Sequence, residues 1–403
     1  MGEVRAKKKK KKKKIHLTSF RKRQKRVNYK EADFALVAVT IALVLFGLLM
    51  VYSASSYENI SKGIVAYRDV IRQGMFALLG LFFMIFFISN FDYHKYNRQV
   101  TTLLVFVTVF LNVAVILFEE TNGASRWIRL GGASFQPSEL AKFAIVLYAA
   151  NMLKRVGTFK KKSWRPVLKV LMVTGILASI IIVLQSNLSI GAIVAFTALV
   201  IIFLSGASFI QVLFPVILGG VGLVLALILE PYRVSRLMSF TKPFEDAQGS
   251  GHQLVQSLYA LTSGGFTGRG LGMSRLKAYW LPEANNDFIF AVIVEELGFI
   301  GGMVLILLIL ILIARGIRIA LTAKDTFGRL LAMGITAVFA LQSLINIAVV
   351  IGAFPVTGVT LPFISSGGTS LFVNLMAVGV LMNISKQKLK AKTPGQSRKE
   401  DRK

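Results

Sequence analysis

Two long stretches without a charged residue constrain the fold of this chain more than any other feature. Residues 170–229 and 330–385 each lack Asp, Glu, Lys and Arg. A helix needs about 20 apolar residues to cross the hydrocarbon core of a bilayer, so each stretch is long enough to cross more than once. Both stretches are apolar on every face, whereas the strands of a transmembrane barrel alternate polar and apolar residues. The sequence therefore predicts an all-α membrane protein in which each stretch folds back on itself.

Composition agrees with this fold class and excludes several functions. Of the 403 residues, 54% are hydrophobic, and the mean hydropathy of +0.64 is far above that of a soluble globular domain. The sequence has no cysteine, so disulfides and thiolate metal sites are excluded. It also has no Gly-Lys-Ser/Thr phosphate loop, serine-hydrolase motif or dinucleotide fingerprint, so chemistry driven by cytosolic nucleotides has no support.

Hydrophobic runs between charge clusters and Gly or Pro breaks predict a bundle of ten transmembrane helices. The predicted spans are about residues 34–53, 71–89, 99–118, 138–153, 167–184, 189–205, 209–229, 288–313, 330–351 and 370–385. Ten crossings return both termini to one side. If that side is cytoplasmic, the cytoplasmic segments hold 36 of the 48 Lys and Arg residues, in agreement with the positive-inside rule. We therefore expect both termini in the cytoplasm and a large extracytoplasmic loop at 230–287, between the seventh and eighth spans.

Basic tails flank the predicted membrane domain, residues 33–385. Residues 1–32 contain 15 Lys or Arg, and residues 386–403 form a second basic tail. Positive-inside tails of this kind bind anionic lipids. Nucleic-acid binding would need interleaved aromatic residues or a recognisable fold, and neither is present. The first apolar segment is long enough to span and has no cleavage pattern, so we expect it to remain attached.

Two outer segments are too elaborate to be simple connections. The loop 230–287 contains seven glycines, a composition that predicts a mobile, ligand-covering loop. The segment GASRWIRLGGASFQPSELAK at 123–142 leads from the third span into the fourth and carries both signs of charge. We expect the function to reside in these two segments.

Four carboxylates gather around the start of the eighth span, in LPEANNDFIFAVIVEELG at 281–298. They are Glu283, Asp287, Glu295 and Glu296. Asp287 stands where the loop becomes a helix, and its position fits either a helix N-cap or a catalytic carboxylate. Ionisable groups inside a span are costly and usually face a cavity, an ion partner or a substrate path. This reasoning applies to Glu295 and Glu296 unless the first turns of the span project beyond the membrane.

Basic residues on the outer side indicate an anionic substrate. A helix start is formed by Gln136, Pro137, Ser138 and Glu139. Glu139 can pair with Lys142, three residues later. The other bases expected on this side include Arg126, Arg129, Arg233, Arg236, Lys242, Arg269, Arg275 and Lys277. Arg and Lys bind diphosphate oxygens strongly in a partly desolvated groove, so a phosphate-bearing, membrane-anchored substrate would explain these bases. Solvated or snorkelling side chains are the alternative for each one.

Aromatic and metal-binding candidates are few. Trp127 is either an interfacial belt residue or a platform for a sugar ring. His252 is the one histidine expected outside, and one histidine without cysteine does not make a zinc site. We expect no metal site and no required cofactor, although a carboxylate-bound Mg²⁺ is compatible with the sequence.

Four segments resemble the signature segments of the SEDS family (shape, elongation, division and sporulation), polytopic bacterial peptidoglycan glycosyltransferases. They are the segments quoted above at 123–142 and 281–298, GSGHQLVQSLYALTSGGFTGRGLG at 249–272 and FPVTGVTLPFISSGGTSLFVNL at 354–375. The resemblance extends from the first span to the last. Within the family, PYRVSRLMSF, QSLYALTSGG and the LPEA form are more similar to the division members, FtsW, than to the elongation members, RodA.

The resemblance implies polymerisation of lipid II outside the cytoplasmic membrane into β-1,4 glycan strands, with release of undecaprenyl diphosphate. It implies septal cell-wall synthesis during division, and it places the family's essential aspartate on Asp287. It also associates Trp127, Glu139 and Lys142 with the same cavity. The implied partners are a class B penicillin-binding transpeptidase and divisome proteins at the septum of a bacterial cytoplasmic membrane.

The chain departs from the family pattern in three places. It has NND at 285–287 where many members have His-Thr-Asp, and SGG at 366–368 where many have Tyr-Gly-Gly. It has QSNL at 185–188 where many have Gln-Pro-Asp-Leu. The aspartate survives the first change, whereas the last removes a carboxylate, so Asn187 receives no acid–base role.

The predicted site uses Asp287 as the general base of glycosyl transfer. The neighbouring carboxylates Glu283, Glu295 and Glu296 are interpreted as groups that shape the loop or tune Asp287. The predicted substrate-binding residues are Arg126, Trp127, Gln136, Ser138, Glu139, Lys142, Arg233, Arg236, Lys277 and Glu283.

Two functions from other classes remain open at this stage. One is a transporter, or flippase, that moves a lipid-linked precursor across the membrane, and the other is a non-catalytic scaffold of a cell-wall complex. A transporter would use ionisable residues deep in several spans, but spans five to seven offer only Gln185 and Asn187 near one end. A scaffold would not need an outer aspartate among basic residues.

Overall fold

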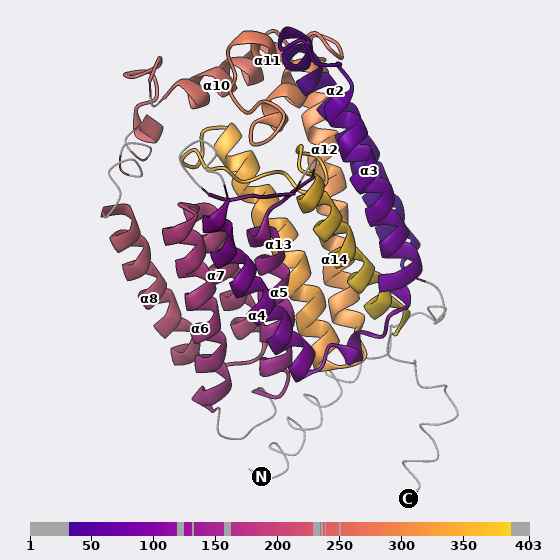
Figure 1. Cartoon of the computed structure of the whole chain (residues 1–403), viewed down its shortest axis with the longest axis vertical. Helices are drawn as coiled ribbons and strands as arrows, with labels where there is room; N and C mark the ends of the chain where they lie inside the picture. The colour runs from indigo at the N-terminus through magenta and orange to yellow at the C-terminus, as the bar shows by residue number, and fades with distance from the viewer. Residues whose placement is uncertain are drawn as a thin grey trace, which may run out of the picture.

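The structure is a computed structural model of the whole chain (Figure 1). It describes residues 32–118, 125–130, 133–156, 163–228, 234, 237, 239–249 and 251–387. Arg233, Arg236 and nearly all of both basic tails lie outside the described residues. The described residues form a helical bundle and one short hairpin, so the predicted helical membrane fold is confirmed with that small β addition.

The long helices follow the apolar runs, because a helix satisfies its own backbone hydrogen bonds in an apolar medium. The α-helices are α2 (Phe34–Ser61), α3 (Arg68–Phe82), α4 (Arg98–Ala114), α5 (Pro137–Leu153), α6 (Trp164–Ser179), α7 (Leu188–Leu204), α8 (Phe209–Ile228), α10 (His252–Gly264), α11 (Leu276–Tyr279), α12 (Ile289–Thr322), α13 (Thr326–Val350) and α14 (Gly368–Lys386). Short π-helical or 3₁₀ turns are η2 (Phe83–Phe87), η3 (Ile88–Asn90), η4 (Tyr93–Lys95), η5 (Val115–Leu117) and η7 (Ile180–Leu184). Side chains of Asp33, Asn97, Asn187 and Asp325 accept backbone N–H groups at the starts of α2, α4, α7 and α13.

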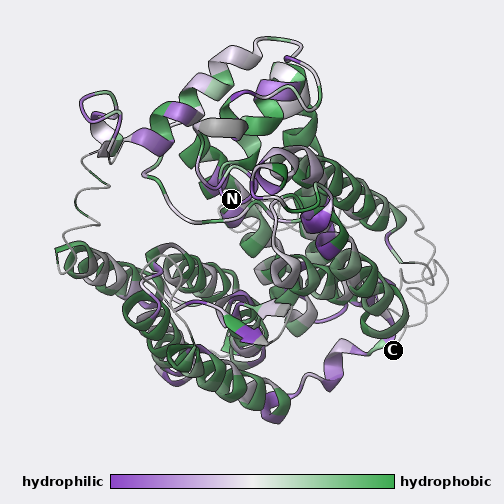
Figure 2. Cartoon of the chain, turned by 45° about the horizontal axis from the view of Figure 1, so that its top comes forward, coloured by the Kyte–Doolittle hydropathy of each residue, from purple (hydrophilic) through white to green (hydrophobic). Residues whose placement is uncertain are grey.

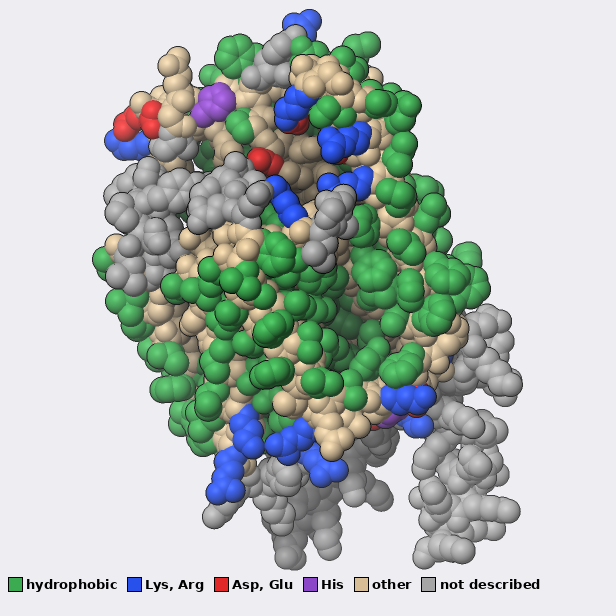
Figure 3. Space-filling model, in the orientation of Figure 1, with side chains coloured by type: hydrophobic (Ala, Val, Ile, Leu, Met, Phe, Trp, Pro, Cys, Tyr) green, Lys and Arg blue, Asp and Glu red, His purple; other side chains and the backbone are tan. Residues whose placement is uncertain are grey.

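Seven of the described helical segments are long and apolar enough to cross a membrane. They are Phe34–Ser61, Arg68–Asn90, Arg98–Leu117, Trp164–Leu184, Ile289–Thr322, Thr326–Val350 and Gly368–Lys386. On the face shown in Figure 3, hydrophobic side chains cover the middle of the molecule, and Lys and Arg side chains lie toward both ends. This distribution is the one expected for a protein that crosses a bilayer several times.

The start of α2 and the end of α14 lie at the same end of the bundle. The backbone N–H of Asp33 donates to Ser385 Oγ (3.1 Å), and Arg315 Nη2 donates to Asp33 Oδ2 (2.6 Å). At this same end, the Tyr93 hydroxyl donates to Asp325 Oδ1 (2.6 Å), which ties the α3–α4 connection to the start of α13. The first and last described helices therefore begin and end on one side, as an even number of crossings requires.

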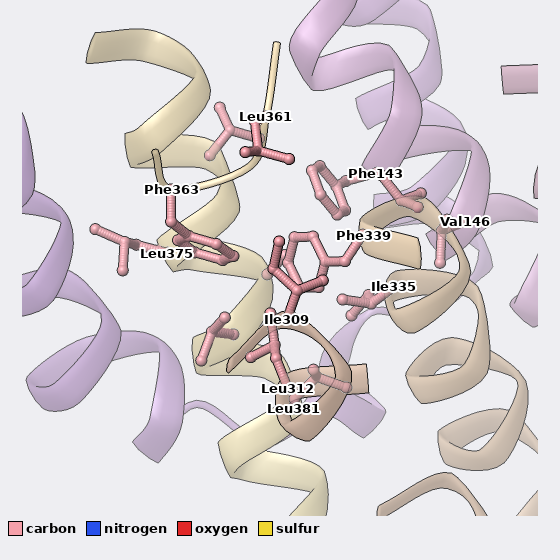
Figure 4. Packing of buried hydrophobic residues seen from close by; sticks show 14 of the residues in the cluster. Phe143, Val146, Ile309, Leu312, Ile335, Phe339, Leu361, Phe363, Leu375 and Leu381 are labelled. Atoms are coloured by element: carbon pink, nitrogen blue, oxygen red, sulfur yellow. The ribbon is translucent and has the colours of Figure 1, made fainter. Parts of the chain in front are cut away.

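The core of the bundle lies between α5, α12, α13 and α14 (Figure 4). The Phe339 ring packs against Phe143 of α5, with ring centroids 5.9 Å apart, and against Phe363, at 5.2 Å. All three rings are buried, and such aromatic pairs add to the stabilisation from buried area. The core thus joins α5 and α13 to the segment that precedes α14.

The other end of the bundle carries α10, α11 and the β-hairpin (Figures 1 and 2). Strand β1 (Ile128–Leu130) pairs antiparallel with β2 (Ala133–Phe135), and Ile128 faces Phe135. The hairpin is held from two sides, because Thr369 Oγ1 donates to Ser134 O (2.7 Å) and Arg72 donates to Ser134 Oγ. Both predicted functional segments therefore lie at the end opposite to Asp33.

Helix α12 is broken near its start. Gly298 has φ 70° and ψ −172°, a conformation that a helix interior does not contain. The loop after α10 supplies backbone hydrogen bonds at the break: Arg269 N donates to Glu295 O (3.0 Å), and Phe299 N donates to Gly265 O (2.9 Å). The sequence predicts one continuous span over 288–313, and the structure corrects this to two helical segments joined at a glycine.

The glycines after α10, from which the sequence predicts a mobile loop, allow close backbone packing in this structure. Gly268 has φ 81°, and a Cβ atom there would lie 2.2 Å from Glu296 O of α12. Gly298 makes the matching approach from the helix side, where a Cβ would lie 2.3 Å from Phe266 O. The part of the outer loop that follows α10 is therefore packed directly on the broken helix.

Candidate active site

Asp287 lies at the entrance to α12 and is half-buried. Helix α12 begins at Ile289 and its N-cap position is Phe288, so Asp287 stands one residue before the cap. Its carboxylate faces the segment between α13 and α14, because a Cβ built on Gly358 would lie 3.3 Å from Asp287 Oδ2. The N-cap position of α12 is therefore Phe288, whereas the N-cap interpretation of the sequence puts Asp287 at this position.

Asn346 of α13 connects the Asp287 backbone to the same segment. Its Nδ2 donates to Asp287 O and to Val359 O, both at 2.7 Å. The side chain of Asn346 is buried, and its Oδ1 has no hydrogen-bond partner among the described residues. The amide of Asn346 therefore bridges Asp287 and Val359, the residue that follows Gly358.

A buried ion pair lies on the α5 side of this arrangement. Lys142 Nζ donates to Glu139 Oε2 (2.9 Å) and to Gln342 Oε1 of α13 (2.8 Å). The side chains of Lys142 and Glu139 are 0% and 2% exposed. Gln342 Nε2 in turn donates to Thr360 O (3.1 Å). The predicted pair is thus present, and it is linked to the segment that faces Asp287.

One helical turn of α13 relates the two halves of the site. Gln342, which binds Lys142, and Asn346, which binds Asp287, are four residues apart, or about 6 Å along a helix. Their partners Thr360 and Val359 are consecutive residues. Asp287, Lys142 and the segment between α13 and α14 therefore meet around a single face of α13, at the end of the bundle that carries the outer loop.

The Glu139–Lys142 pair supplies a testable prediction. Reversing either charge alone would leave two like charges buried together, and breaking a buried pair costs about 3–5 kcal/mol. Reversing both, in Glu139→Lys with Lys142→Glu, restores opposite charges and should recover part of the lost stability. The measurement is the thermal unfolding midpoint of the detergent-solubilised protein, and strictly additive losses would show that the two side chains act separately.

The exposed pair Lys242–Glu245 is the matched control for this charge reversal. It has the same spacing of three residues and a 2.7 Å contact, but both of its side chains are about two-thirds exposed, at 67% and 68%. Exposed ion pairs contribute little to stability, so reversing its charges should change the unfolding midpoint little.

A second buried cluster attaches the outer loop to the helices, and we call it the loop anchor. Lys277 Nζ donates to Glu296 Oε1 (2.5 Å) and to Ser53 Oγ of α2 (2.9 Å). Ser274 Oγ donates to Glu295 Oε2 (2.5 Å). The Lys277 side chain is 3% exposed and both glutamates are fully buried. The loop anchor consists of Ser53, Ser274, Lys277, Glu295 and Glu296.

The loop anchor contains the contacts of the two internal glutamates. Both lie just before the break at Gly298, and their charges are matched by donors from the loop. The interpretation that Glu295 and Glu296 shape the loop agrees with these contacts. The ammonium of Lys277 is occupied by the anchor, and its predicted role in substrate binding stays a prediction.

Arg126 and Trp127 lie where the chain enters the hairpin. Arg126 Nε donates to Gln185 O (2.9 Å), and its Nη2 donates to Ser186 O (2.8 Å). These bonds fix the hairpin to the turn between η7 and α7. Trp127 is half-buried. The structure brings Arg126 to the α7 side of the molecule, and the predicted contacts of Arg126 and Trp127 with substrate stay predictions.

Gln136 and Ser138 lie at the start of α5, and Glu283 lies in the loop before α12. Gln136 is the buried N-cap position of α5 and makes no side-chain cap bond. Ser138 is fully buried, and its Oγ has no partner among the described residues. Glu283 is exposed, has φ 55°, and accepts a hydrogen bond from Asn286 Nδ2 (2.6 Å). The binding roles predicted for these residues stay predictions.

Sequence reasoning missed Gln342, Asn346 and Thr360, which join the two halves of the site. A signal for the amides was present, since Gln342 and Asn346 are two polar residues at i and i+4 in a charge-free stretch. Such spacing places both on one helix face, where a buried amide needs a partner. Among the described residues, no group of three or more His, Asp or Glu side chains is placed to hold a metal ion.

Comparison with known proteins identifies the family. Residues 34–390 match the family described as cell cycle protein, which groups FtsW, RodA and SpoVE. The chain belongs to this family. Stage V sporulation protein E of Bacillus subtilis is 43% identical over 361 residues, which cover 88% of this chain and 97% of the relative. A probable peptidoglycan glycosyltransferase FtsW of Trichlorobacter lovleyi is 40% identical over 365 residues, which cover 88% and 93%.

Solved structures of the FtsW, RodA and SpoVE family share the fold. A chain of a peptidoglycan synthase complex, described for its coordination of polymerization and crosslinking, superimposes with a TM-score of 0.72 and 26% identity. The match covers 89% of this chain and 99% of that one. The rod shape determining protein RodA of Thermus thermophilus superimposes with a TM-score of 0.65 and 25% identity, with coverages of 89% and 98%. The resemblance stated from the sequence motifs is confirmed.

Proposed function

We propose that this chain is a peptidoglycan glycosyltransferase that polymerises lipid II outside the cytoplasmic membrane. The observation that carries the proposal is that Asp287 and the buried Glu139–Lys142 pair contact α13 through Asn346 and Gln342, which are about one helical turn apart, at the end of the bundle with the outer loop. The names of the relatives, several of them probable peptidoglycan glycosyltransferases, support the reaction class. A transporter or a scaffold gives no reason for a half-buried aspartate held at this position.

In the proposed reaction, Asp287 accepts the proton of the acceptor sugar hydroxyl. The hydroxyl oxygen then attacks the anomeric carbon of the donor, a β-1,4 bond forms, and the bond to the diphosphate oxygen breaks. Undecaprenyl diphosphate leaves with the electron pair. Cations on the outer side stabilise the negative charge that develops on the diphosphate. A pre-arranged hydrogen-bond donor or cation stabilises such charge most where water is excluded. No step of this proposal requires a metal ion or a cofactor.

The Glu139–Lys142 pair has an electrostatic role in this scheme. Its charges offset each other, and Gln342 fixes the Lys142 ammonium next to the segment that faces Asp287. A fixed dipole in a buried site keeps its orientation during the reaction and costs no reorganisation. The same proposal includes the predicted substrate contacts. They are those of Arg126, Trp127, Gln136, Ser138, Lys277 and Glu283, and those of Arg233 and Arg236.

Ten crossings and cytoplasmic termini are part of the proposed arrangement, because a helix occupies each of the ten predicted ranges. We expect a reporter fused after Gly265 to be extracytoplasmic, and reporters after Lys161 and Lys392 to be cytoplasmic, since Lys and Arg are retained inside. Alkaline phosphatase and fluorescent protein fusions measure the two outcomes. A cytoplasmic reporter after Gly265 would contradict the location of the site.

The proposed partner is a class B penicillin-binding transpeptidase that crosslinks the new strands. Its support is the similar chain from a peptidoglycan synthase complex in which polymerization and crosslinking are coordinated. We place the protein in a bacterial cytoplasmic membrane and, from the FtsW relatives, at the division septum with divisome proteins. The basic tails would bind anionic lipids of the inner leaflet.

Reconstitution tests the proposal directly. Purified full-length protein in liposomes, supplied with labelled lipid II and with or without the transpeptidase, should convert the label into long glycan strands. Movement of lipid II between leaflets without polymer would favour the transporter, and neither activity in the presence of the transpeptidase would favour the scaffold.

A further inference from the structure

The backbone carbonyls of residues 285, 286 and 287 each accept a hydrogen bond from a residue outside the loop. Ser366 N donates to Asn285 O (2.9 Å), and Ser365 Oγ donates to Asn286 O (2.7 Å). Asn346 Nδ2 donates to Asp287 O (2.7 Å). The donors come from two separate parts of the chain, and together they satisfy all three carbonyls. We call these three bonds the carbonyl clamp.

Ser365 is itself held firmly. Its Oγ accepts from Leu361 N (2.7 Å), and its own carbonyl accepts from Gln73 Nε2 of α3 (3.0 Å). Gln73 Oε1 also accepts from Gly367 N (2.9 Å). The two serine donors of the carbonyl clamp directly precede α14 and are attached to α3 through Gln73, so they are not free to follow a moving loop.

Asn346 contributes the bond closest to the carboxylate. Its amide group spans Asp287 O and Val359 O, and both bonds are short. The side chain is 1% exposed, so a lost donor would leave two carbonyls without this partner in a buried place. Its second polar atom, Oδ1, has no partner among the described residues, so the amide serves through its two donated bonds.

Gly358 lies close to the Asp287 carboxylate and leaves no space for a side chain between them. A methyl group on Gly358 would lie 3.3 Å from Asp287 Oδ2, which is tighter than an ordinary van der Waals contact. The Asp287 carboxylate therefore lies against the backbone of Gly358, and Asn346 holds the backbone carbonyl of the same aspartate. A displacement of the carbonyl clamp would move the carboxylate with it.

We propose that Asn346 and Ser365 are positioning residues that fix the Asp287 carboxylate for proton transfer through the backbone of residues 285–287. This inference rests on the proposed function, in which Asp287 is the general base. Neither residue touches the reacting atoms, and both act by holding the backbone that carries the base. A misplacement of a reacting group by about 1 Å can cost about 100-fold in rate.

The first test compares Asn346→Leu and Ser365→Ala with the unaltered chain in the full-length protein, with labelled lipid II as the probe. We expect the turnover number to fall about 100-fold for Asn346→Leu and about 10-fold for Ser365→Ala, with KM nearly unchanged, because substrate binding does not use these residues. Asn374→Leu is the matched control. Asn374 is a fully buried amide of α14 whose described contact is one long bond to Ser370 Oγ (3.4 Å), and its replacement should leave turnover near normal.

A double-mutant cycle separates positioning from a structural role. In an Asp287→Asn background there is no base to position, so Asn346→Leu should reduce the residual rate less than about 3-fold. Gly358→Ala provides a third variant that removes no hydrogen bond and should lower turnover about 10-fold by pushing Asp287 Oδ2. If Asn346→Leu does not fold, Ser365→Ala and Gly358→Ala decide the question with the same assay.

The inference is overturned if Asn346→Leu, Ser365→Ala and Gly358→Ala polymerise at normal rates while Asp287→Asn is inactive. It is also overturned if Asn346→Leu causes the same fold loss whether or not Asp287→Asn is present, because the amide would then act independently of the base. Normal polymerisation by Asp287→Asn would instead contradict the proposed function itself, so the two failures are distinguishable.

Discussion

Asp287→Asn is expected to abolish nearly all glycan synthesis while leaving the protein folded. Loss of a general base typically lowers a rate by about 10²–10⁴, and an amide of the same size cannot accept the proton. The fold should tolerate the change, because asparagine has the size of aspartate, its amide oxygen still accepts hydrogen bonds, and the bond to Asn346 uses the backbone carbonyl. The measurement is polymer formation from labelled lipid II by the reconstituted variant, together with its unfolding midpoint and its binding to the transpeptidase.

Glu283→Gln is the control for this variant. Glu283 lies earlier in the same loop, is exposed, and accepts one bond from Asn286, so its loss should reduce synthesis much less. Near-normal synthesis by Asp287→Asn would contradict the base assignment. Glu295 and Glu296 could not then take over, because both are fully buried and bound within the loop anchor.

The positions of the apolar helices could be predicted from the sequence, because the membrane imposes one simple requirement, although α2 and α12 extend eight and nine residues beyond their predicted ends and α10 was not predicted. Each apolar run that crosses the bilayer must satisfy its backbone internally, and the sequence marks the runs by the absence of charge. The pair Glu139–Lys142 was also predictable, since a spacing of three residues places both on one face of α5. The position of Asp287 before α12 followed from the point where the loop sequence becomes apolar.

The connections within the site could not be predicted in the same way. The bonds from Ser365 and Asn346 reach backbone carbonyls, and any residue at 286 or 287 presents a carbonyl, so the sequence carries no mark of the pairing. The break in α12 is similarly hidden. Glycine is frequent in membrane helices, and what makes Gly298 a break is the backbone of the loop after α10, which comes from an earlier part of the chain.

The contacts of Lys277 illustrate the same limit. A lysine in an outer loop of a protein that binds a diphosphate is reasonably interpreted as a substrate ligand, and that role stays a prediction. What the sequence did not indicate is that its ammonium lies between Glu296 and Ser53, with 3% of the side chain exposed. The partner of a charge depends on the path of the loop, and composition does not determine that path.

Lys277→Met is therefore expected to detach the outer loop from the helices. The substitution leaves Glu296 charged and fully buried without a cation, and breaking a buried pair costs about 3–5 kcal/mol. The loop can open more cheaply than the whole bundle can unfold, because hydrophobic packing holds the bundle separately. We expect faster hydrogen exchange over residues 264–277 and slower polymerisation, since the helix segment that follows Asp287 ends at this anchor.

Restoring a neutral pair should reverse much of this effect. In Lys277→Met with Glu296→Gln no unpaired charge remains buried at this position, so exchange over 264–277 should return toward that of the unaltered chain. Lys62→Met is the matched control, because Lys62 pairs with Glu58 at 2.5 Å on the surface, where the two side chains are 60% and 51% exposed. If Lys277→Met and Lys62→Met changed exchange and unfolding equally little, the buried pair would not hold the loop. If the double variant were as labile as Lys277→Met, the loss would come from the packing of the lysine stem and not from the uncompensated charge.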